Sequence, residues 1–454
     1  MTINQDLISI FGVDKIVKTS DIINYSKDMG DYEANPFAVI RADNENDIIK
    51  TVNYAKTHSI PIVVWGAGSS LTGAVVLDNS LVLDLSKMTK IIKIDPINWY
   101  VHVQPGITLE DLNEELKKHN FFFPPDPASS SICTVGGAIA EGSGGMKCVK
   151  YGTVKDWVLS LKVVLANGNS VNLGEPLAKN RAGYDLVHLM VGSEGTLGII
   201  TEAWLKIIPI PTYETVLMQI FFNDLKYAQN TIQNIRKSLI IPSMIEFMDK
   251  DVIQAINAVT DLNLPDCEAL IIMEIKKNSL NKITEICKSS GSSKIILPKT
   301  EEEADQLYSA RATAYLAVRQ LASGIHIEDV VVPIDKLSDY LLTVKNIASK
   351  YNLTIPLLGH AGDGNVHPNI LYDKSDPVSV ENASHAFEDI CKYAIDVGGS
   401  ITGEHGVGIQ KMKLFKDQIL SHNGDDVLYL MKSIKKLFDP QGLFNPGKYV
   451  EVED

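Results

Sequence analysis

Two histidines flank a short turn-forming stretch late in the chain. The sequence GHAGDGNVHPNI, residues 359–370, places His360 and His367 on either side of two glycines, an aspartate and an asparagine. Glycine and asparagine tolerate the positive φ angles of a tight reversal, and the flanking runs TIPLL and NILY are mainly apolar. This pattern predicts a β-hairpin in which the two imidazoles are cross-strand neighbours, with Cβ atoms about 4.5–5.5 Å apart.

A second short motif, TGEHGVG at residues 402–408, could complete a metal site with this histidine pair. Glu404 would give a set of two imidazoles and one carboxylate, which leaves coordination positions open as catalytic sites do. His405 would then serve in acid–base chemistry. Adjacent residues of a regular strand face opposite ways, so both can serve one site only if the backbone is irregular, as the neighbouring glycines permit. The other interpretation, ordinary polar turn residues, stays open on these motifs alone.

Composition limits the classes of partner. The chain has 454 residues, enough for two or three domains, and its formal net charge of −14 argues against nucleic acid or an anionic membrane surface. Its five scattered cysteines never form a CxxC pair, which argues against an iron–sulfur cluster and indicates a reducing compartment. The N-terminus does not resemble a signal peptide, and no apolar run approaches the roughly 20 residues of a membrane span. We therefore expect the protein in the cytoplasm or peripherally at a membrane.

The elements that must position these motifs alternate between helix and strand patterns, which predicts an α+β fold. Thr108 and Asp111 form an acidic capping box, and Asn167-Gly168 is the signal of a two-residue type I′ hairpin. We expect helices at residues 43–58, 108–119, 225–239, 280–287, 301–322 and 377–397. Strands are expected at residues 60–66, 81–86, 91–95, 99–106, 214–222, 269–275 and 328–333, with two strands joined by Asn167-Gly168 within residues 157–174 and a long strand at the end of residues 183–209.

Three glycine- and serine-rich tracts lie in the first half, at residues 66–73, 124–154 and 183–209. Glycine costs conformational entropy, so its repeated use suggests that backbone amides approach a large anionic ligand closely. No tract fits the GxGxxG dinucleotide motif or the Gly-Lys-Ser/Thr nucleotide loop in the required context. A pyrophosphate-bearing cofactor held by another fold is the remaining interpretation.

These tracts and the two histidine motifs carry a family resemblance. VWGAGSSLTGA, TVGGAIAEGSGG, VGSEGTLGIITEAWLKI, GHAGDGNVHPN, TGEHGVG and LFDPQGLFNPGKY follow one another between about residues 36 and 450. In this order they resemble the FAD-linked oxidases of the vanillyl-alcohol-oxidase (PCMH) type. Within them the chain is most similar to the branch of D-lactate dehydrogenases, the glycolate oxidase flavin subunit and D-2-hydroxyglutarate dehydrogenase.

The resemblance implies a domain layout and a cofactor site. After an N-terminal extension at 1–35, it predicts a PCMH-type FAD-binding domain at 36–209. A substrate and metal domain at 210–454 follows, with a ferredoxin-like sheet and C-terminal helices that return to the flavin. The expected FAD-binding residues are Gly66, Ala67, Gly68, Ser69, Ser70, Thr72, Asp126, Ser129, Gly136, Gly137, Ser143, Gly144, Tyr151, Gly152, Val154, Glu194, Gly195, Ile200 and Asn445.

FAD is expected to be non-covalent, because the first glycine loop lacks the histidine that attaches it in some relatives. Cys133 and Cys148 raise the idea of a cysteinyl flavin, but a small buried thiol is the commoner role of such residues.

The resemblance also assigns the chemistry. The metal ligands would be His360, His367 and Glu404, with zinc, manganese or iron as the divalent ion. His405 would be the general base for an α-hydroxy acid whose hydride passes to the flavin. Arg311 would pair with the substrate carboxylate, and Asn369 matches a further polar position of the family.

The implied substrate is small. Tyr315 and Ile327 stand near positions where relatives that act on 2-hydroxyglutarate have threonine and lysine, so a second carboxylate loses its expected partners. D-lactate, glycolate or D-2-hydroxybutyrate is favoured. The electron acceptor would be a quinone, a cytochrome, an electron-transfer flavoprotein, an iron–sulfur subunit or an artificial dye, and a homodimer is left open.

Three other functions stay open: the flavin subunit of a multi-subunit glycolate oxidase complex, an enzyme like alkylglycerone-phosphate synthase, and a flavin protein without catalytic activity.

Overall fold

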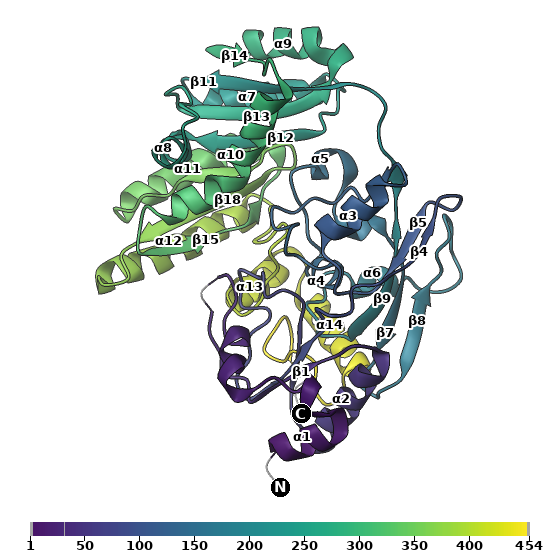
Figure 1. Ribbon diagram of the computed structural model, residues 1–454. Coiled ribbons are helices and arrows are strands. Elements are labelled where there is room, and N and C mark those ends of the chain that lie inside the picture. The colour runs from purple at the N-terminus through teal and green to yellow at the C-terminus, as the bar shows by residue number, and fades with distance from the viewer. Residues whose placement is uncertain (1–2, 31, 452–454) are drawn as a thin grey trace. The chain divides into compact units, whose positions relative to one another are not determined.

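The computed structural model describes residues 3–30 and 32–451, without the side chains of residues 3, 4, 301 and 308–313. Contacts between residues divide the chain into two compact units (Figure 1). Unit 1 comprises residues 1–144, 153–210 and 404–454, and unit 2 comprises residues 145–152 and 211–403. The C-terminal residues from Glu404 onward therefore belong to the unit of the glycine-rich tracts, whereas residues 145–152 leave those tracts for unit 2.

Unit 1 contains a parallel sheet of order β1-β3-β2, an antiparallel sheet of order β4-β5-β9-β7-β8, and the pair β6 and β10. Its strands are β1 Ala38–Arg41, β2 Ile62–Trp65, β3 Leu81–Asp84, β4 Ile91–Asp95, β5 Tyr100–Val103, β6 Phe121–Phe122, β7 Val158–Val164, β8 Ser170–Gly174, β9 Ile199–Lys206 and β10 Ile208–Pro209. Its α-helices are α1 Ile3–Phe11, α2 Glu45–His58, α3 Leu109–Lys117, α4 Val135–Glu141, α6 Val187–Met190, α13 Met412–His422 and α14 Asp425–Phe438.

Local capping signals explain where the helices of unit 1 begin. The Asn44 side chain accepts a hydrogen bond from the backbone N–H of Asp47 at the start of α2. Thr108 does the same for Asp111 at the start of α3, which confirms the predicted helix start. Each cap satisfies one of the backbone donors that a helix end leaves unpaired.

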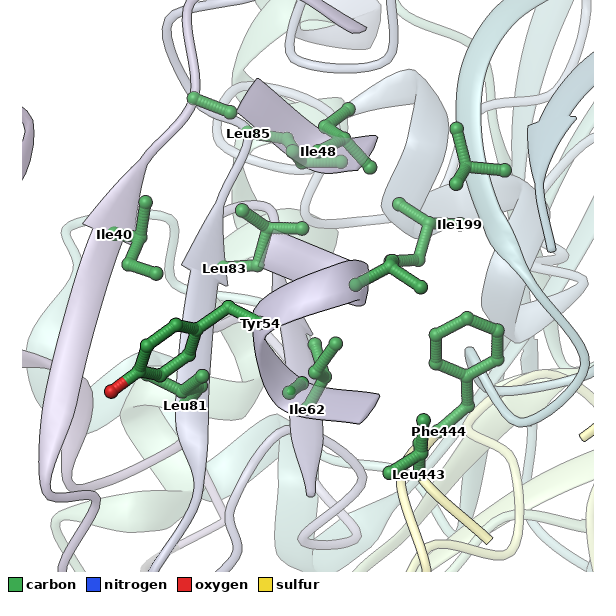
Figure 2. Close-up of a cluster of buried hydrophobic side chains, with 14 of the residues drawn as sticks. Ile40, Ile48, Tyr54, Ile62, Leu81, Leu83, Leu85, Ile199, Leu443 and Phe444 are labelled. Carbon is green, nitrogen blue, oxygen red and sulfur yellow. The ribbon is translucent and has the colours of Figure 1, made fainter. Parts of the chain in front are cut away.

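The core of unit 1 joins segments from both ends of its sequence. Figure 2 shows Ile40, Leu81 and Leu83 of the parallel sheet packed with Ile48 and Tyr54 of α2, and with Leu443 and Phe444. The backbone of this C-terminal segment runs beside β2, because Ile62 N–H donates to Leu443 O at 2.7 Å and Asn445 N–H donates to Ile62 O at 2.9 Å. The C-terminal segment is thus part of the core of unit 1.

The turn between β7 and β8 differs from the sequence prediction. A type I′ turn needs positive φ at both central residues, but Gly168 has a φ of 87° while Asn167 does not have positive φ. Leu165 O instead accepts from Gly168 N–H, and Leu165 N–H donates to Asn169 O. The hairpin is therefore correct but the type I′ assignment is wrong, because the loop is longer and only its glycine takes the left-handed conformation.

Unit 2 is built on one large sheet of order β14-β11-β13-β12-β17-β18-β15, with β16 also paired to β18. Its strands are β11 Thr215–Phe222, β12 Met244–Asp249, β13 Ala269–Lys276, β14 Lys294–Ile296, β15 Gly324–Ile327, β16 Val330–Val331, β17 Leu357–His360 and β18 Asn365–Tyr372. Its α-helices are α5 Cys148–Tyr151, α7 Leu225–Lys237, α8 Lys250–Val259, α9 Leu280–Ser289, α10 Glu301–Arg319, α11 Leu337–Lys350 and α12 Pro377–Asp396. The predicted α+β class and the antiparallel sheet backed by helices are confirmed.

The helices and the cysteines bear on the expected absence of a membrane span and on the expected redox compartment. No helix among the described residues is both long and apolar enough to cross a membrane. All five cysteines are free thiols, and four of them are buried.

Candidate active site and cofactor-binding loops

The histidine-bearing segment forms the predicted hairpin, β17 and β18, but with a different register. His360 lies opposite Asn365, and His367 lies opposite Leu358. The prediction that the two imidazoles are direct cross-strand partners is therefore wrong. They are diagonal neighbours on one face of the sheet, with ring centroids 5.2 Å apart and ring planes at 83°.

This face of the sheet is covered by α8 and α10. Leu358 and Leu371 pack with residues of both helices, and strand alternation puts His360, His367 and Asn369 on the same face. Arg311 lies on α10, but its side chain is outside the described residues. The helix predicted to supply the carboxylate-binding arginine thus covers the histidine face.

Buried acceptors fix both imidazoles. The Nδ1 of His360 lies 2.7 Å from Glu246 Oε1, and the Nδ1 of His367 lies 3.3 Å from Glu328 O. Because a carbonyl or carboxylate oxygen only accepts, each Nδ1 carries the hydrogen and each Nε2 of the neutral ring carries the lone pair. This is the arrangement of metal-binding histidines, whose second nitrogen donates to a carboxylate or carbonyl. The residues therefore fit a metal ion.

A buried aspartate ties the hairpin to the chain that leads to Glu404. Asp329 accepts from Asn365 Nδ2 at 2.7 Å, from Thr402 Oγ1 at 2.7 Å and from Gly403 N–H at 2.8 Å. Its Oδ1 also lies 3.7 Å from His367 Nδ1. Asp329 thereby fixes the residue immediately before Glu404 beside the strand that carries His367.

The stretch 401–409 belongs to neither helix nor strand, which confirms the predicted irregular backbone. In unit 1, His405 O accepts from Thr72 Oγ1 at 3.3 Å. The Glu194 carboxylate accepts from Val407 N–H at 2.6 Å and Gly408 N–H at 2.9 Å. The loop that carries His405 is thus held by two of the glycine-rich tracts.

Only glycine fits between these anchors at position 406. Gly406 has a φ of 80°, and a Cβ there would lie 2.6 Å from Glu141 Oε2 and 2.6 Å from Glu194 Oε1. Burial, together with the nearby Glu194 charge, raises the pKa of Glu141 well above its ordinary value. Burial thus favours the neutral form of Glu141 beside the His405 loop.

The predicted cofactor residues of unit 1 lie mostly in the loops that connect its strands and helices. The members of this set are Gly66–Ser70 and Thr72 after β2, Asp126 and Ser129 before α4, Gly136 and Gly137 in its first turn, Ser143 and Gly144 after it, Val154 before β7, Glu194 and Gly195 before β9, Ile200 within β9, and Asn445 after α14. Tyr151 and Gly152 instead lie in the segment that belongs to unit 2.

Thr134 and Cys133 bring the first two of these loops together. Thr134 Oγ1 accepts from Gly137 N–H at 3.2 Å and lies 2.4 Å from where a Cβ on Gly66 would be. The Cys133 thiol interacts with Ser69 and Ser129, and burial raises its pKa to about 11. Cys133 is therefore a protonated thiol and a poor nucleophile.

Asn445 contacts the loop that carries Glu194, and its side-chain oxygen stays available to a ligand. Its Nδ2 donates to Ala74 O at 2.8 Å and to Glu194 O at 2.7 Å. Its Oδ1 is buried without a hydrogen-bond partner among the described residues, as is Glu141 Oε2. Unsatisfied buried polar atoms beside glycine-lined loops fit a large cofactor that has both hydrogen-bond donors and acceptors, as FAD does.

Comparison with known proteins identifies the family. The model described as "FAD binding domain" matches residues 36–174, and "FAD linked oxidases, C-terminal domain" matches residues 211–449. The chain belongs to the FAD-linked oxidases. The recognition made from the sequence motifs is thereby confirmed, and FAD is the cofactor of the family's binding domain.

Two curated relatives of this FAD-linked oxidase cover nearly its whole length. The glycolate oxidase subunit GlcD of Bacillus subtilis is 38% identical over 92% of this chain and 89% of its own. The D-lactate dehydrogenase of Archaeoglobus fulgidus is 33% identical over 92% of both chains.

Solved structures show the fold. p-Cresol methylhydroxylase superposes with a TM-score of 0.79 at 20% identity, covering 98% of this chain and 95% of its own. An alkyldihydroxyacetonephosphate synthase superposes with a TM-score of 0.77 at 18% identity, covering 98% of this chain and 85% of its own. The PCMH-type fold expected from the sequence is confirmed.

The sequence interpretation missed the acids that support this oxidase's site. Glu246 and Asp329 are separated in sequence from the residues they contact, and neither belongs to a pattern that we interpreted as functional. Glu141 lies within TVGGAIAEGSGG, a motif that carried the flavin resemblance, but it was not among the expected cofactor residues. The available signal was an acidic residue inside an apolar strand, as in MIEFMD around Glu246, which is 0% exposed. Buried acids in apolar strands need a partner, so they indicate an internal site.

Proposed function

We propose that this FAD-linked oxidase converts a small D-2-hydroxy acid, D-lactate or glycolate, to the 2-oxo acid. The observation that carries the proposal is the pair of buried imidazoles whose Nδ1 atoms are held by Glu246 and Glu328. Relatives named as a glycolate oxidase subunit and a D-lactate dehydrogenase support the substrate class.

Two groups would be bound. His360, His367 and Glu404 would hold a divalent ion, and two imidazoles with a carboxylate suit zinc, manganese or iron. FAD would bind without a covalent bond, because the loop 66–70 has no histidine and the Cys133 thiol is protonated.

The chemistry divides between these groups and the chain. When bound, FAD would supply the hydride acceptor and the divalent ion would supply a Lewis acid for the hydroxyl group. His405 accepts the hydroxyl proton as the Cα–H bond breaks, so the substrate loses one hydride and one proton. Arg311 pairs with the carboxylate and fixes which face of Cα is presented.

Asn369 acts beside them as a positioning residue. Its Nδ2 donates to His367 O at 2.8 Å and to Pro356 O at 3.4 Å, so the side chain is fixed in the hairpin.

A second candidate function is that of the flavin subunit of a multi-subunit oxidase. It is favoured by one observation, the name of the relative at 38% identity, which is a glycolate oxidase subunit. This chain would then pass electrons to an iron–sulfur partner within a complex. Co-purification with a cysteine-rich protein that accepts electrons from the reduced flavin would support this function. The likeness to alkyldihydroxyacetonephosphate synthase concerns the fold alone.

The test is an anaerobic titration of the FAD- and metal-loaded protein with D-lactate, L-lactate, glycolate and D-2-hydroxyglutarate. We expect the flavin absorbance to bleach with D-lactate or glycolate and not with L-lactate, and chelation to abolish bleaching. Yellow protein that none of the four acids reduces would refute the substrate assignment.

Glu246→Gln is expected to weaken binding of the divalent ion about 10–100-fold. The amide is a weaker acceptor for His360 Nδ1, so the imidazole loses both orientation and basicity. The measurement is competition with a chromophoric chelator. Glu268→Gln, the same change at an exposed residue of unit 2, serves as the control, and equal affinities of the two variants would contradict the role of Glu246.

A further inference from the structure

A short segment flanked by predicted flavin contacts, and containing two more of them in Tyr151 and Gly152, belongs to unit 2. Residues 145–152, named here the bridging segment, follow Ser143 and Gly144 and precede Val154, all three expected to contact FAD. Gly145 and Gly152 bound it, with φ angles of 156° and 74°. The chain therefore leaves the flavin loop, forms α5 on unit 2 and returns.

The bridging segment packs on the tip of the histidine hairpin. A Cβ on Gly362 would lie 2.7 Å from Val149 Cγ2 and 2.8 Å from Val149 Cβ, so the glycine allows direct contact of Val149 with the hairpin backbone. On the same residue, Gly362 O accepts from Arg236 Nη1 at 2.8 Å. The turn that separates His360 from His367 is thus held between Val149 and Arg236.

Further contacts fix the bridging segment to unit 2. Met146 packs against the hydrophobic cluster that contains Leu358 of β17. Lys150 Nζ donates to Ser243 Oγ at 3.2 Å and to Tyr213 Oη, and its ammonium lies 5.0 Å from the centroid of the Tyr213 ring. A displacement of the segment would therefore disturb its contacts with Ser243, with Tyr213 and with the hydrophobic cluster that contains Leu358.

We propose that the bridging segment couples FAD binding to metal binding, with Val149 as the positioning residue. The inference rests on the proposed metal site. FAD contacts at residues 143–144 and 154 would fix both glycine-bounded ends of the segment, and Val149 would hold the hairpin tip. Metal–nitrogen bonds need distances near 2.0–2.1 Å, so a small shift of the hairpin changes affinity. The coupling is reciprocal, because thermodynamic linkage requires the bound metal to increase the affinity for FAD by the same factor.

The experiment measures the dissociation constant of Zn²⁺ on flavin-free and FAD-loaded protein, by competition with a chromophoric chelator. In the wild type we expect bound FAD to lower the dissociation constant of Zn²⁺ by about 5–150-fold, the usual size of coupling between two sites. Val149→Ala should reduce this ratio towards one. Val259→Ala, the same change at an exposed position of α8, should leave it unchanged.

A second variant guards against a folding defect. Gly362→Ala adds the methyl group that would press on Val149, and it should weaken Zn²⁺ binding in FAD-loaded protein whose circular dichroism is unchanged. Equal Zn²⁺ affinities with and without FAD in the wild type, or a Val149→Ala ratio equal to that of the wild type, would overturn the coupling. Zn²⁺ binding that His360→Ala does not weaken would refute the metal site itself, which is a distinct result.

Discussion

Replacing His405 by alanine is expected to slow reduction of the bound flavin by D-lactate about 10²–10⁴-fold, the usual contribution of a general base. The variant should stay folded and yellow, because the loop is held through its backbone. Thr72 Oγ1 donates to His405 O, and Glu194 accepts from Val407 and Gly408 N–H. The substitution thus removes the imidazole and leaves these anchors in place.

The measurement is stopped-flow bleaching of the flavin at saturating substrate, with the bound FAD and metal quantified in the same sample. His119→Ala, at an exposed position just after α3, is the matched control. A His405→Ala variant that bleaches as fast as the His119→Ala protein would contradict the assignment of the base. Slow bleaching with lost FAD or metal would show instead that His405 supports binding.

The hairpin was predictable because its turn chemistry is local, but the register was not. Two glycines, an aspartate and an asparagine are compatible with turns of different lengths. Each turn length pairs different residues across the two strands. The turn observed pairs His360 with Asn365 and thereby makes the two imidazoles diagonal neighbours. The prediction of a histidine pair holds, while the prediction of direct opposition fails.

The supporting acids could not be predicted for a different reason. Glu246 lies 114 residues before the histidine it contacts, and it reaches His360 only because β12 pairs with β17. Strand order in a sheet depends on long-range pairing, which single-sequence patterns do not encode. Residues 145–152 show the same limit, because the glycine-rich tract that contains them does not indicate which unit they join.

Replacing Lys435 by methionine is expected to lower the free energy of unfolding by about 3–5 kcal/mol, because it leaves a buried carboxylate without its cation. The Lys435 side chain is 4% exposed and that of Asp439 is 0% exposed, with Nζ and Oδ2 at 2.6 Å. Nζ also donates to Thr196 O and to Phe444 O, each at 2.8 Å. Asp439 in turn accepts from the N–H groups of Leu443 and Phe444.

The effect should extend to the flavin, because this ion pair holds the segment that ends in Asn445. Asn445 directly follows Phe444, whose N–H and carbonyl are both bound by the pair. We therefore expect weaker FAD binding as well as a lower urea midpoint. Lys436→Met, the same change at the exposed neighbour, should alter stability by no more than about 0.5 kcal/mol. If the two variants unfold at the same urea concentration and bind FAD equally, the buried pair neither stabilises unit 1 nor positions Asn445.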